Sequence, residues 1–391
     1  KRIRTCRRQM DSPCTRSKGA VMIPCANPAA QFYSYQDEIE AAVLKVLRSN
    51  RYILGAEVET LENEFADYIG THSAIGVANG TDALEIAIRA LDIGPCDEVI
   101  TVSHTAVATV AAIEAAGATP VLVDVDPVFY TLNPAQLQEV LTPKTKAVIA
   151  VHLYGQAADL DAIGQFCAEN KLFLIEDVSQ AHGAKWKGKR LGSIGHIACY
   201  SCYPTKNLGA IGDAGLITTH DAKLGNKVRM LREYGWQHRY ISVLVGRNSR
   251  LDELQAAILR IKLRHLDADN SKRRQLAAQY SKLLAGQALQ LPATRENTEQ
   301  VFHLYVIRTS NRHELIEYLK ARDIQAGIHY PMPVHLQPAY KNRIRTATDM
   351  SVTERLAEEV LSLPMYPELL STDIARVIDV VNSYLVKFAS T

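Results

Sequence analysis

The sequence predicts an α/β protein with a mostly parallel central sheet in a large domain and a smaller C-terminal α/β domain. Between residue 73 and about residue 220, short β-rich runs alternate with helical patterns, which is typical of a doubly wound sheet. The runs at residues 146–151 and 172–175 are apolar on both faces, as central strands covered by helices are. Polar residues follow these strands, at the sheet edge where such folds bind ligands.

The elements follow from this alternation in chain order. We expect strands at residues 74–78, 98–102, 120–124, 147–152 and 172–176, and helices at residues 82–91, 106–116 and 160–170. After residue 250, Leu and Ile recur at intervals of three and four residues, which predicts helices over residues 251–267 and 271–284. A second α/β region should contain a strand at 303–309, a loop at 331–338, and helices at 312–322, 353–361 and 372–388.

We place the domain limits where the pattern of apolar residues changes and where the basic N-terminal segment ends. We predict a large domain at residues 22–260 and a small one at residues 261–391. Residues 1–20 carry a charge of +6, which leaves −4 for residues 21–391. We expect residues 1–21 to be a basic leader that is disordered or not native. The acidic remainder argues against a nucleic-acid partner, which requires clustered Lys and Arg.

Composition narrows the class of protein further. With 391 residues, 47% hydrophobic and 22% charged, the chain has the make-up of a soluble globular enzyme. Of the seven cysteines, only Cys199 and Cys202 have CxxC spacing, and we interpret these two as packing residues; the pattern suits reduced thiols in the cytoplasm. No His, Cys or acidic cluster has metal-ligand spacing, so we predict no metal site. The longest weakly charged stretch, residues 105–123, is interrupted by Glu114, Gly117 and Pro120, so we expect no membrane span.

Asn79-Gly-Thr-Asp-Ala83 lies where a predicted strand ends and a helix begins. Backbone amides are unpaired at such a helix start, and the positive end of the helix dipole lies behind them. We therefore interpret this segment as an anion site. The alternative is that Thr81 only caps the helix.

Further along the chain, a carboxylate and a lysine are two more candidate site residues. The strand ending Glu176-Asp177 leads into Ser179-Gln-Ala-His-Gly183, where an acid could bind metal, act as a base or hold a protonated ring nitrogen, or simply end a strand. Lys206 lies in Tyr203-Pro-Thr-Lys-Asn-Leu208, among small and apolar residues that would lower the pKa of its amine. The glycines after it match neither a phosphate loop nor a dinucleotide fingerprint.

An anion site, a strand-end carboxylate and an amine are together what pyridoxal 5'-phosphate requires. The chain resembles the DegT/DnrJ/EryC1/StrS family of sugar aminotransferases, which have the fold type I architecture of pyridoxal-phosphate-dependent transferases. The resemblance extends over residues 22–388. It rests on Tyr52-Ile-Leu-Gly55, Val77-Ala-Asn-Gly-Thr-Asp-Ala-Leu84, Ile175-Glu-Asp-Val-Ser-Gln-Ala-His-Gly183, Ser201-Cys-Tyr-Pro-Thr-Lys-Asn-Leu208, Asn248-Ser-Arg-Leu-Asp-Glu-Leu-Gln-Ala-Ala257 and His329-Tyr-Pro331.

The resemblance implies a role for each matched residue. Lys206 would form the Schiff base and carry the proton, and Asp177 would pair with the pyridine nitrogen. The other implied cofactor contacts are Gly80, Thr81 and Ser201 at the phosphate, Gln180 at the ring hydroxyl, and His104 stacked on the ring. Asn248 would reach the phosphate across the interface of a homodimer. His329 and Tyr330 would lie near the nucleotide sugar, although a purely structural role is equally open for both.

The resemblance also implies an activity, with L-glutamate as the usual amino donor and a nucleotide-linked keto sugar as the acceptor. The products would be 2-oxoglutarate and an amino-sugar nucleotide of the kind used in lipopolysaccharide or other glycan biosynthesis. The segments at residues 102–110 and 248–251 resemble the branch that acts at C3 of dTDP-linked 3-keto-6-deoxyhexoses. The alternatives are a 4-keto-sugar aminotransferase and a catalytically silent cofactor-binding regulator. A dehydratase of the same family would carry His in place of Lys206.

Overall fold

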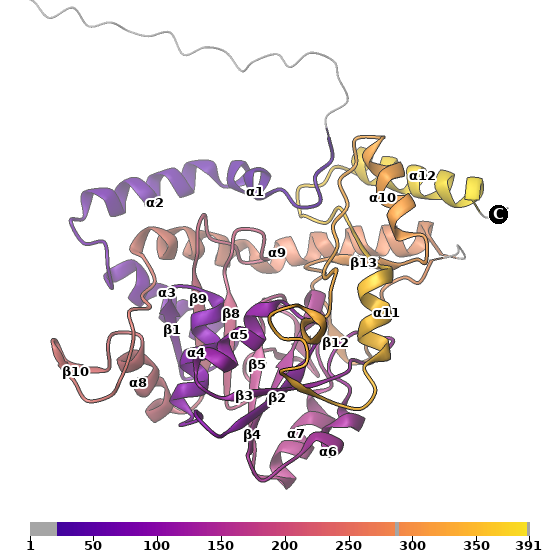
Figure 1. Cartoon of the computed structure of the whole chain (residues 1–391). Coiled ribbons are helices and arrows are strands. Elements are labelled where there is room, and N and C mark those ends of the chain that lie inside the picture. Colours follow the sequence, from indigo (N-terminus) through magenta and orange to yellow (C-terminus); the bar gives the residue numbers. More distant parts are fainter. Residues whose placement is uncertain (1–21, 286–288, 389–391) are drawn as a thin grey trace, which may run out of the picture.

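The computed structural model describes residues 22–285 and 289–388. The predicted basic leader at residues 1–21 lies outside the described residues. Within that part of the chain, Figure 1 shows one large sheet, the long helix α9 running across it, and a smaller group of C-terminal elements at one end. No helix there is long and apolar enough to cross a membrane.

The large sheet confirms the predicted mostly parallel α/β fold. Its strand order is β1-β9-β8-β5-β4-β2-β3-β14, and β9 pairs antiparallel with both neighbours while the remaining pairs are parallel. In that order the strands are β1 (Ser73–Val77), β9 (Gly215–Thr219), β8 (Ile197–Ser201), β5 (Phe173–Asp177), β4 (Thr145–Val151), β2 (Glu98–Val102), β3 (Thr119–Val123) and β14 (Arg345–Thr346). The apolar runs lie in the central strands β4 and β5, which are almost completely buried.

Helices cover the sheet because parallel strands need crossover connections. Helix α4 packs on β8 and β9 and beside α5 and α8, whereas α7 packs on β4 and β5. The helices of this region are α3 (Ala56–Ile69), α4 (Gly80–Ala90), α5 (Val107–Ala115), α6 (Leu137–Val140), α7 (Leu160–Glu169) and α8 (Ala222–Leu231), with short 3-10 turns η1 (Pro134–Gln136) and η2 (Leu153–Gly155).

Helix α9 (Glu253–Leu283) is one continuous helix, so the predicted break between residues 267 and 271 is wrong. The polar residues at that point are buried and satisfied by distant partners. The Asp269 carboxylate accepts a hydrogen bond from the Tyr35 hydroxyl at 2.9 Å, and the Asn270 amide donates to the His182 carbonyl at 2.8 Å. Helices α1 (Pro28–Ser34) and α2 (Gln36–Arg48) precede α3, and α2 packs along α9.

The C-terminal elements have a hydrophobic cluster of their own, drawn from Ile23 and from residues 276–385. A pair of antiparallel strands, β13 (Tyr305–Arg308) and β15 (Val360–Leu363), lies at its centre. Residues 360–361, predicted as helix, belong to β15 because this distant pairing overrides the local pattern. The flanking helices are α10 (Arg312–Lys320), α11 (Ser351–Glu359) and α12 (Ser371–Phe388), with the turn η3 (Val334–Leu336). The domain division at residue 260 stays a prediction, since α9 continues through it.

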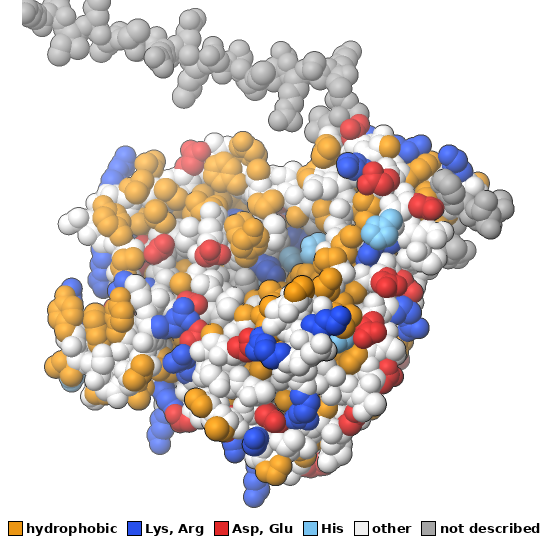
Figure 2. Space-filling view, viewed as in Figure 1, with side chains coloured by type: hydrophobic (Ala, Val, Ile, Leu, Met, Phe, Trp, Pro, Cys, Tyr) orange, Lys and Arg blue, Asp and Glu red, His pale blue; other side chains and the backbone are white. Residues whose placement is uncertain are grey.

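Short strand pairs complete the structure. Strands β10 (Trp236–His238) and β11 (Ile241–Ser242) form a hairpin that projects from the body beside α8, at the left of Figure 1. Strands β12 (Thr298–Glu299), β6 (Lys185–Trp186) and β7 (Lys189–Arg190) form a small antiparallel sheet. The hairpin and the residues after it leave apolar side chains exposed, among them Tyr240 (72% exposed) and Val245 (86% exposed). Figure 2 shows hydrophobic side chains gathered in this region.

Candidate active site

A cavity of about 600 Å³ opens at the carboxyl edge of the large sheet. Five segments line it: residues 79–84 at the start of α4, residues 105–109 around the start of α5, residues 151–153 at the end of β4, residues 177–180 at the end of β5, and residues 201–213 after β8. The segments meet because the strands they follow run in the same direction in one sheet, so their carboxyl ends share one edge. Asp177 pairs across the sheet with Val151 of β4 and with Cys199 of β8. The predicted site residues Gly80, Thr81, Asp177, Gln180, Ser201 and Lys206 all line this one cavity.

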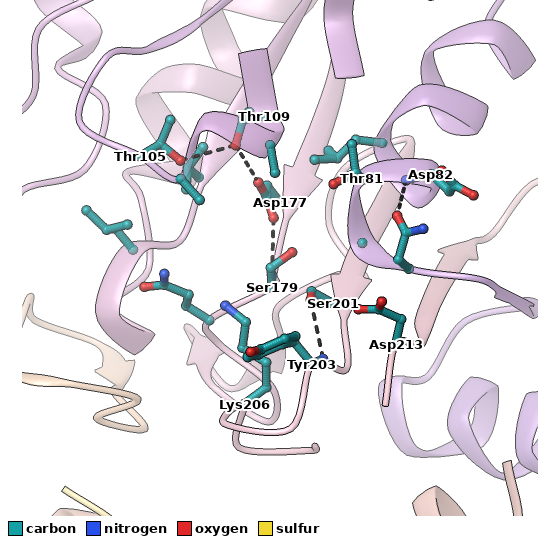
Figure 3. Close-up of a pocket in the computed structure, with 18 residues that line it drawn as sticks. Thr81, Asp82, Thr105, Thr109, Asp177, Ser179, Ser201, Tyr203, Lys206 and Asp213 are labelled. Carbon is teal, nitrogen blue, oxygen red and sulfur yellow. Dashed lines mark hydrogen bonds between the residues drawn. The ribbon is translucent and has the colours of Figure 1, made fainter. Parts of the chain in front are cut away.

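The start of α4 forms the predicted anion site. The helix is capped by Asn79, whose side-chain oxygen accepts a hydrogen bond from the Asp82 amide at 2.8 Å. The alternative in which Thr81 serves as the cap is therefore wrong, and the Thr81 hydroxyl lines the cavity (Figure 3). The free amides of the first helical turn and the α4 dipole favour a negative group here.

Gly80 is required by a close approach. A Cβ atom at this position would lie 2.5 Å from the Cβ and 2.9 Å from the Cα of Ser201. We therefore predict that Gly80→Ala displaces the Ser201 loop and weakens pyridoxal phosphate binding by about tenfold or more. Gly164→Ala is the matched control, because a Cβ at Gly164 in α7 meets nothing within 4 Å. Titration of both cofactor-free variants with pyridoxal phosphate measures the change, and equal affinities would contradict the assignment.

Asp177 and Glu176 end β5 but point to opposite faces, as alternating strand residues do. Glu176 faces away from the cavity, where its carboxylate accepts hydrogen bonds from the backbone amides of Gly192 (2.8 Å) and Ile194 (2.9 Å). Asp177 lines the cavity and is 5% exposed. Its carboxylate accepts hydrogen bonds from the Thr109 hydroxyl at 3.0 Å and the Ser179 amide at 3.2 Å (Figure 3). These two hydrogen bonds fix the orientation of the Asp177 carboxylate at the cavity wall.

Lys206 supplies a buried amine. Its backbone amide donates to the Tyr203 carbonyl at 2.8 Å in a turn, and its side chain points into the cavity toward Asp177 (Figure 3). Burial lowers the pKa of the Lys206 amine to about 8, while the charges of Asp177 and Cys202 oppose that shift. The amine makes no hydrogen bond within the part of the chain that is described. The lowered pKa gives this amine a larger neutral, nucleophilic fraction near neutral pH than a solvated lysine has.

The remaining predicted residues lie beside the cavity or outside it. His104 is buried, and its Nε2 lies 2.7 Å from the Tyr154 hydroxyl. The Gln180 amide donates to the Tyr330 hydroxyl at 3.0 Å, and His329 Nδ1 lies 2.9 Å from the Ser362 hydroxyl. Asn248 is exposed and does not line the cavity of its own chain. His104, His329 and Tyr330 also stay outside the lining.

The sequence interpretation missed several residues of the site. Thr109, Tyr203 and Asp213 line the cavity, and Tyr154 contacts both His104 and Gln180. Thr109 could have been found, since Thr105 and Thr109 lie one helical turn apart after a strand and their hydroxyls are 3.1 Å apart. Tyr154 carries no such signal, because its contacts come from segments far away in the chain.

The residues present fit pyridoxal phosphate. The helix start suits its phosphate, Asp177 suits a protonated ring nitrogen, and the unpartnered Lys206 amine suits its aldehyde. Because Gly80 has no Cβ, the start of α4 can approach Ser201 closely, which brings two of the predicted phosphate contacts together. Among residues 22–285 and 289–388, no group of three His, Cys, Asp or Glu side chains could hold a metal ion.

Comparison with known proteins shows which family the chain is similar to. Residues 34–382 match the model of the DegT/DnrJ/EryC1/StrS aminotransferase family. The chain is 45% identical to the dTDP-3-amino-3,4,6-trideoxy-alpha-D-glucose transaminase of Streptomyces venezuelae, over 93% of this chain and 96% of that protein. It is 46% identical to the dTDP-3-amino-3,6-dideoxy-alpha-D-galactopyranose transaminase of Aneurinibacillus thermoaerophilus, over 93% and 99%.

A solved structure extends the likeness to the fold. The crystal structure of S. venezuelae DesV in complex with a ketimine intermediate superposes with a TM-score of 0.91 at 44% identity. The match includes 94% of this chain and 99% of that chain. The pyridoxal-phosphate-transferase fold expected for this chain is thereby confirmed.

Proposed function

We propose that this chain, which belongs to the DegT/DnrJ/EryC1/StrS aminotransferase family, transfers an amino group from L-glutamate to C3 of a dTDP-linked 3-keto-6-deoxyhexose. The chain is a pyridoxal-phosphate-dependent aminotransferase. The observation that carries the proposal is that Lys206, Asp177 and the α4 anion site line one cavity. The products are an amino-sugar nucleotide and 2-oxoglutarate.

The residues of the cavity divide the work. Bound pyridoxal phosphate supplies an electron sink that makes the Cα proton of an amino donor removable. Gly80, Thr81 and Ser201 hold its phosphate at the start of α4, and Asp177 keeps the ring nitrogen protonated. The Lys206 amine, whose pKa is about 8, would take the proton from Cα of the amino donor and pass it to the former aldehyde carbon of the cofactor within the same half-reaction.

The first half of the cycle is tested by absorbance. We expect the enzyme as purified to absorb near roughly 400–430 nm, as a protonated lysine imine of pyridoxal phosphate does. L-Glutamate should convert this band to one near roughly 330 nm, as the cofactor becomes an amine. A visible band that persists with every amino donor would overturn the proposal and favour the silent regulator.

The acceptor is tested separately. The pyridoxamine form of the enzyme is mixed with a panel of 3-keto and 4-keto nucleotide sugars in a single turnover, and NMR of the product locates the new amine. We expect amination at C3. The similarity to the two dTDP-3-amino-sugar transaminases favours this branch over the 4-keto alternative. Amination at C4 alone would contradict the proposed acceptor and leave the aminotransferase activity intact.

The proposed enzyme is a homodimer in which Asn248 reaches the phosphate site of the other subunit. Asn248 is exposed and lies outside its own cavity, and the nearby β10–β11 hairpin exposes apolar side chains that need a cover. Sedimentation equilibrium should give the mass of two chains, and the mass of one chain would refute this arrangement. We place the reaction in the cytoplasm because the described cysteines are free thiols.

A further inference from the structure

Tyr154 occupies an unusual place in the fold. It lies in the turn η2 directly after β4, it is 4% exposed, and its backbone has φ +59° and ψ 7°. This left-handed conformation is disfavoured for a bulky residue that has a Cβ atom. A tyrosine persists in such a conformation only where the surrounding contacts over-determine it, and such sites gather at functional centres. The contacts of Tyr154 therefore indicate what the conformation serves.

The Tyr154 hydroxyl connects two segments. It donates a hydrogen bond to the backbone carbonyl of His329, and its oxygen also lies 2.7 Å from Nε2 of His104. The Tyr154 hydroxyl uses its single proton in the hydrogen bond to the His329 carbonyl, which can only accept. The proton in the contact between Tyr154 and His104 must therefore be carried by His104 Nε2. Burial lowers the pKa of His104 to about 4, so the ring is neutral near pH 7 and its Nδ1 carries no proton.

The Tyr154 backbone orients a second residue. Its amide donates to the side-chain oxygen of Gln180 at 2.8 Å. Because a backbone amide is only a donor, the oxygen of Gln180 must face it and the nitrogen must face the other way. That nitrogen donates to the Tyr330 hydroxyl at 3.0 Å and keeps one further N–H. Gln180 lines the cavity, so this donor is available at the cavity wall.

We propose that Tyr154 is a positioning residue for amino transfer: its hydroxyl sets the Nε2–H tautomer and ring orientation of His104, and its amide sets the orientation of the Gln180 side chain. The inference rests on the proposed function and on the cofactor-ring contacts that the family resemblance implies for His104 and Gln180. Both residues are tied through Tyr154 and its partners to the segment His329–Tyr330 of the C-terminal region. Tyr154 thus positions His104 and Gln180 relative to residues 329–330, the segment that the resemblance places near the nucleotide sugar.

The tautomer can be measured directly. Long-range ¹H–¹⁵N NMR of the ¹⁵N-histidine-labelled full chain distinguishes a protonated Nε2 from a protonated Nδ1. The His104 signal is assigned by its loss in His104→Gln. We expect a single Nε2–H tautomer in the wild-type protein, with or without cofactor. A wild-type His104 with its proton on Nδ1 would overturn the proposal, and this measurement needs no Tyr154 variant to fold.

Tyr154→Phe removes the hydroxyl and keeps the ring and the amide contact to Gln180. We expect mixed His104 tautomers and a kcat about tenfold lower with KM for glutamate little changed, as for other residues that orient a site residue. Tyr280→Phe is the matched control, because its buried hydroxyl also bonds a carbonyl, that of Pro364 at 3.0 Å, far from His104. It should keep the Nε2–H tautomer and the wild-type kcat.

The outcomes separate the two proposals. A Tyr154→Phe protein that keeps a single Nε2–H tautomer of His104 would refute the positioning role, whatever its activity. Equal losses of kcat in Tyr154→Phe and Tyr280→Phe would also refute it, because a general loss of packing would explain both. If the tautomer results hold and the wild-type enzyme aminates no keto sugar, the proposed function fails and the assignment of Tyr154 stands.

Discussion

Lys206→Ala should lose turnover by about 10²–10⁴-fold or more, because the variant lacks the group that moves the proton. The band near roughly 400–430 nm should disappear, since no lysine imine forms at position 206. The cofactor should still bind noncovalently through the α4 anion site and Asp177, which the substitution leaves in place. Steady-state assays and absorbance after gel filtration measure both effects. Unchanged turnover would refute the assignment of Lys206.

The chain offers a matched control for this substitution. Lys262 is also buried, and burial lowers its pKa to about 8 as well. Its amine donates to the Gly209 carbonyl and does not line the cavity. Lys262→Met should therefore lower thermal stability and keep the visible band. A loss of that band in Lys262→Met alone would mean that the wrong lysine has been identified.

The lowered pKa of Lys206 also predicts a pH dependence. Only the neutral amine attacks an aldehyde, so the rate at which the cofactor-free enzyme captures pyridoxal phosphate should rise with pH and level off above about 8. Between about pH 8 and 10.5 the unfolded chain binds more protons at this lysine than the folded chain does. Stability of the cofactor-free protein therefore gains from rising pH in that window, and Lys206→Ala should remove that gain. The difference between the two pH–stability curves tests the sign.

Asp177→Asn should reduce kcat/KM by about 10²–10³-fold, the range seen when one electrostatic partner of a reacting group is removed. The amide is nearly isosteric and can still accept a hydrogen bond from Thr109 or Ser179, so the change removes mainly the charge. Without that charge the ring nitrogen loses its proton near neutral pH, and the electron sink weakens. Kinetics and the absorbance of the bound cofactor measure the effect.

Thr109→Val is the control for the charge. It removes the 3.0 Å hydrogen bond to Asp177 and leaves the carboxylate in the cavity. We expect a loss of about tenfold, the lower end of what one hydrogen bond to a charged group contributes, because the Ser179 amide still binds the carboxylate. Equal losses in Asp177→Asn and Thr109→Val would show that geometry, and not the charge of Asp177, is what matters at this position.

The alternation of strands and helices was sufficient to predict the parallel sheet, because the period of apolar residues depends on local geometry. The same pattern located the residues that follow each strand, and parallel strands bring such residues to one edge. The sequence therefore predicts that Asp177 and Thr81 share one cavity, and both residues line it. Strands β8 and β9 were missed, since Ile197–Ser201 and Gly215–Thr219 are recognisable only through their pairing.

By itself, the sequence determined the fold class, the family and the chemical groups of the cavity, because these follow from local periodicity and contiguous motifs. Tertiary structure alone decided that α9 is unbroken and that Tyr154 joins His104 to Gln180. Both depend on competition for hydrogen-bond partners between segments distant in the chain. No local pattern encodes which partner a buried donor finds, since that choice is made only when the segments pack together.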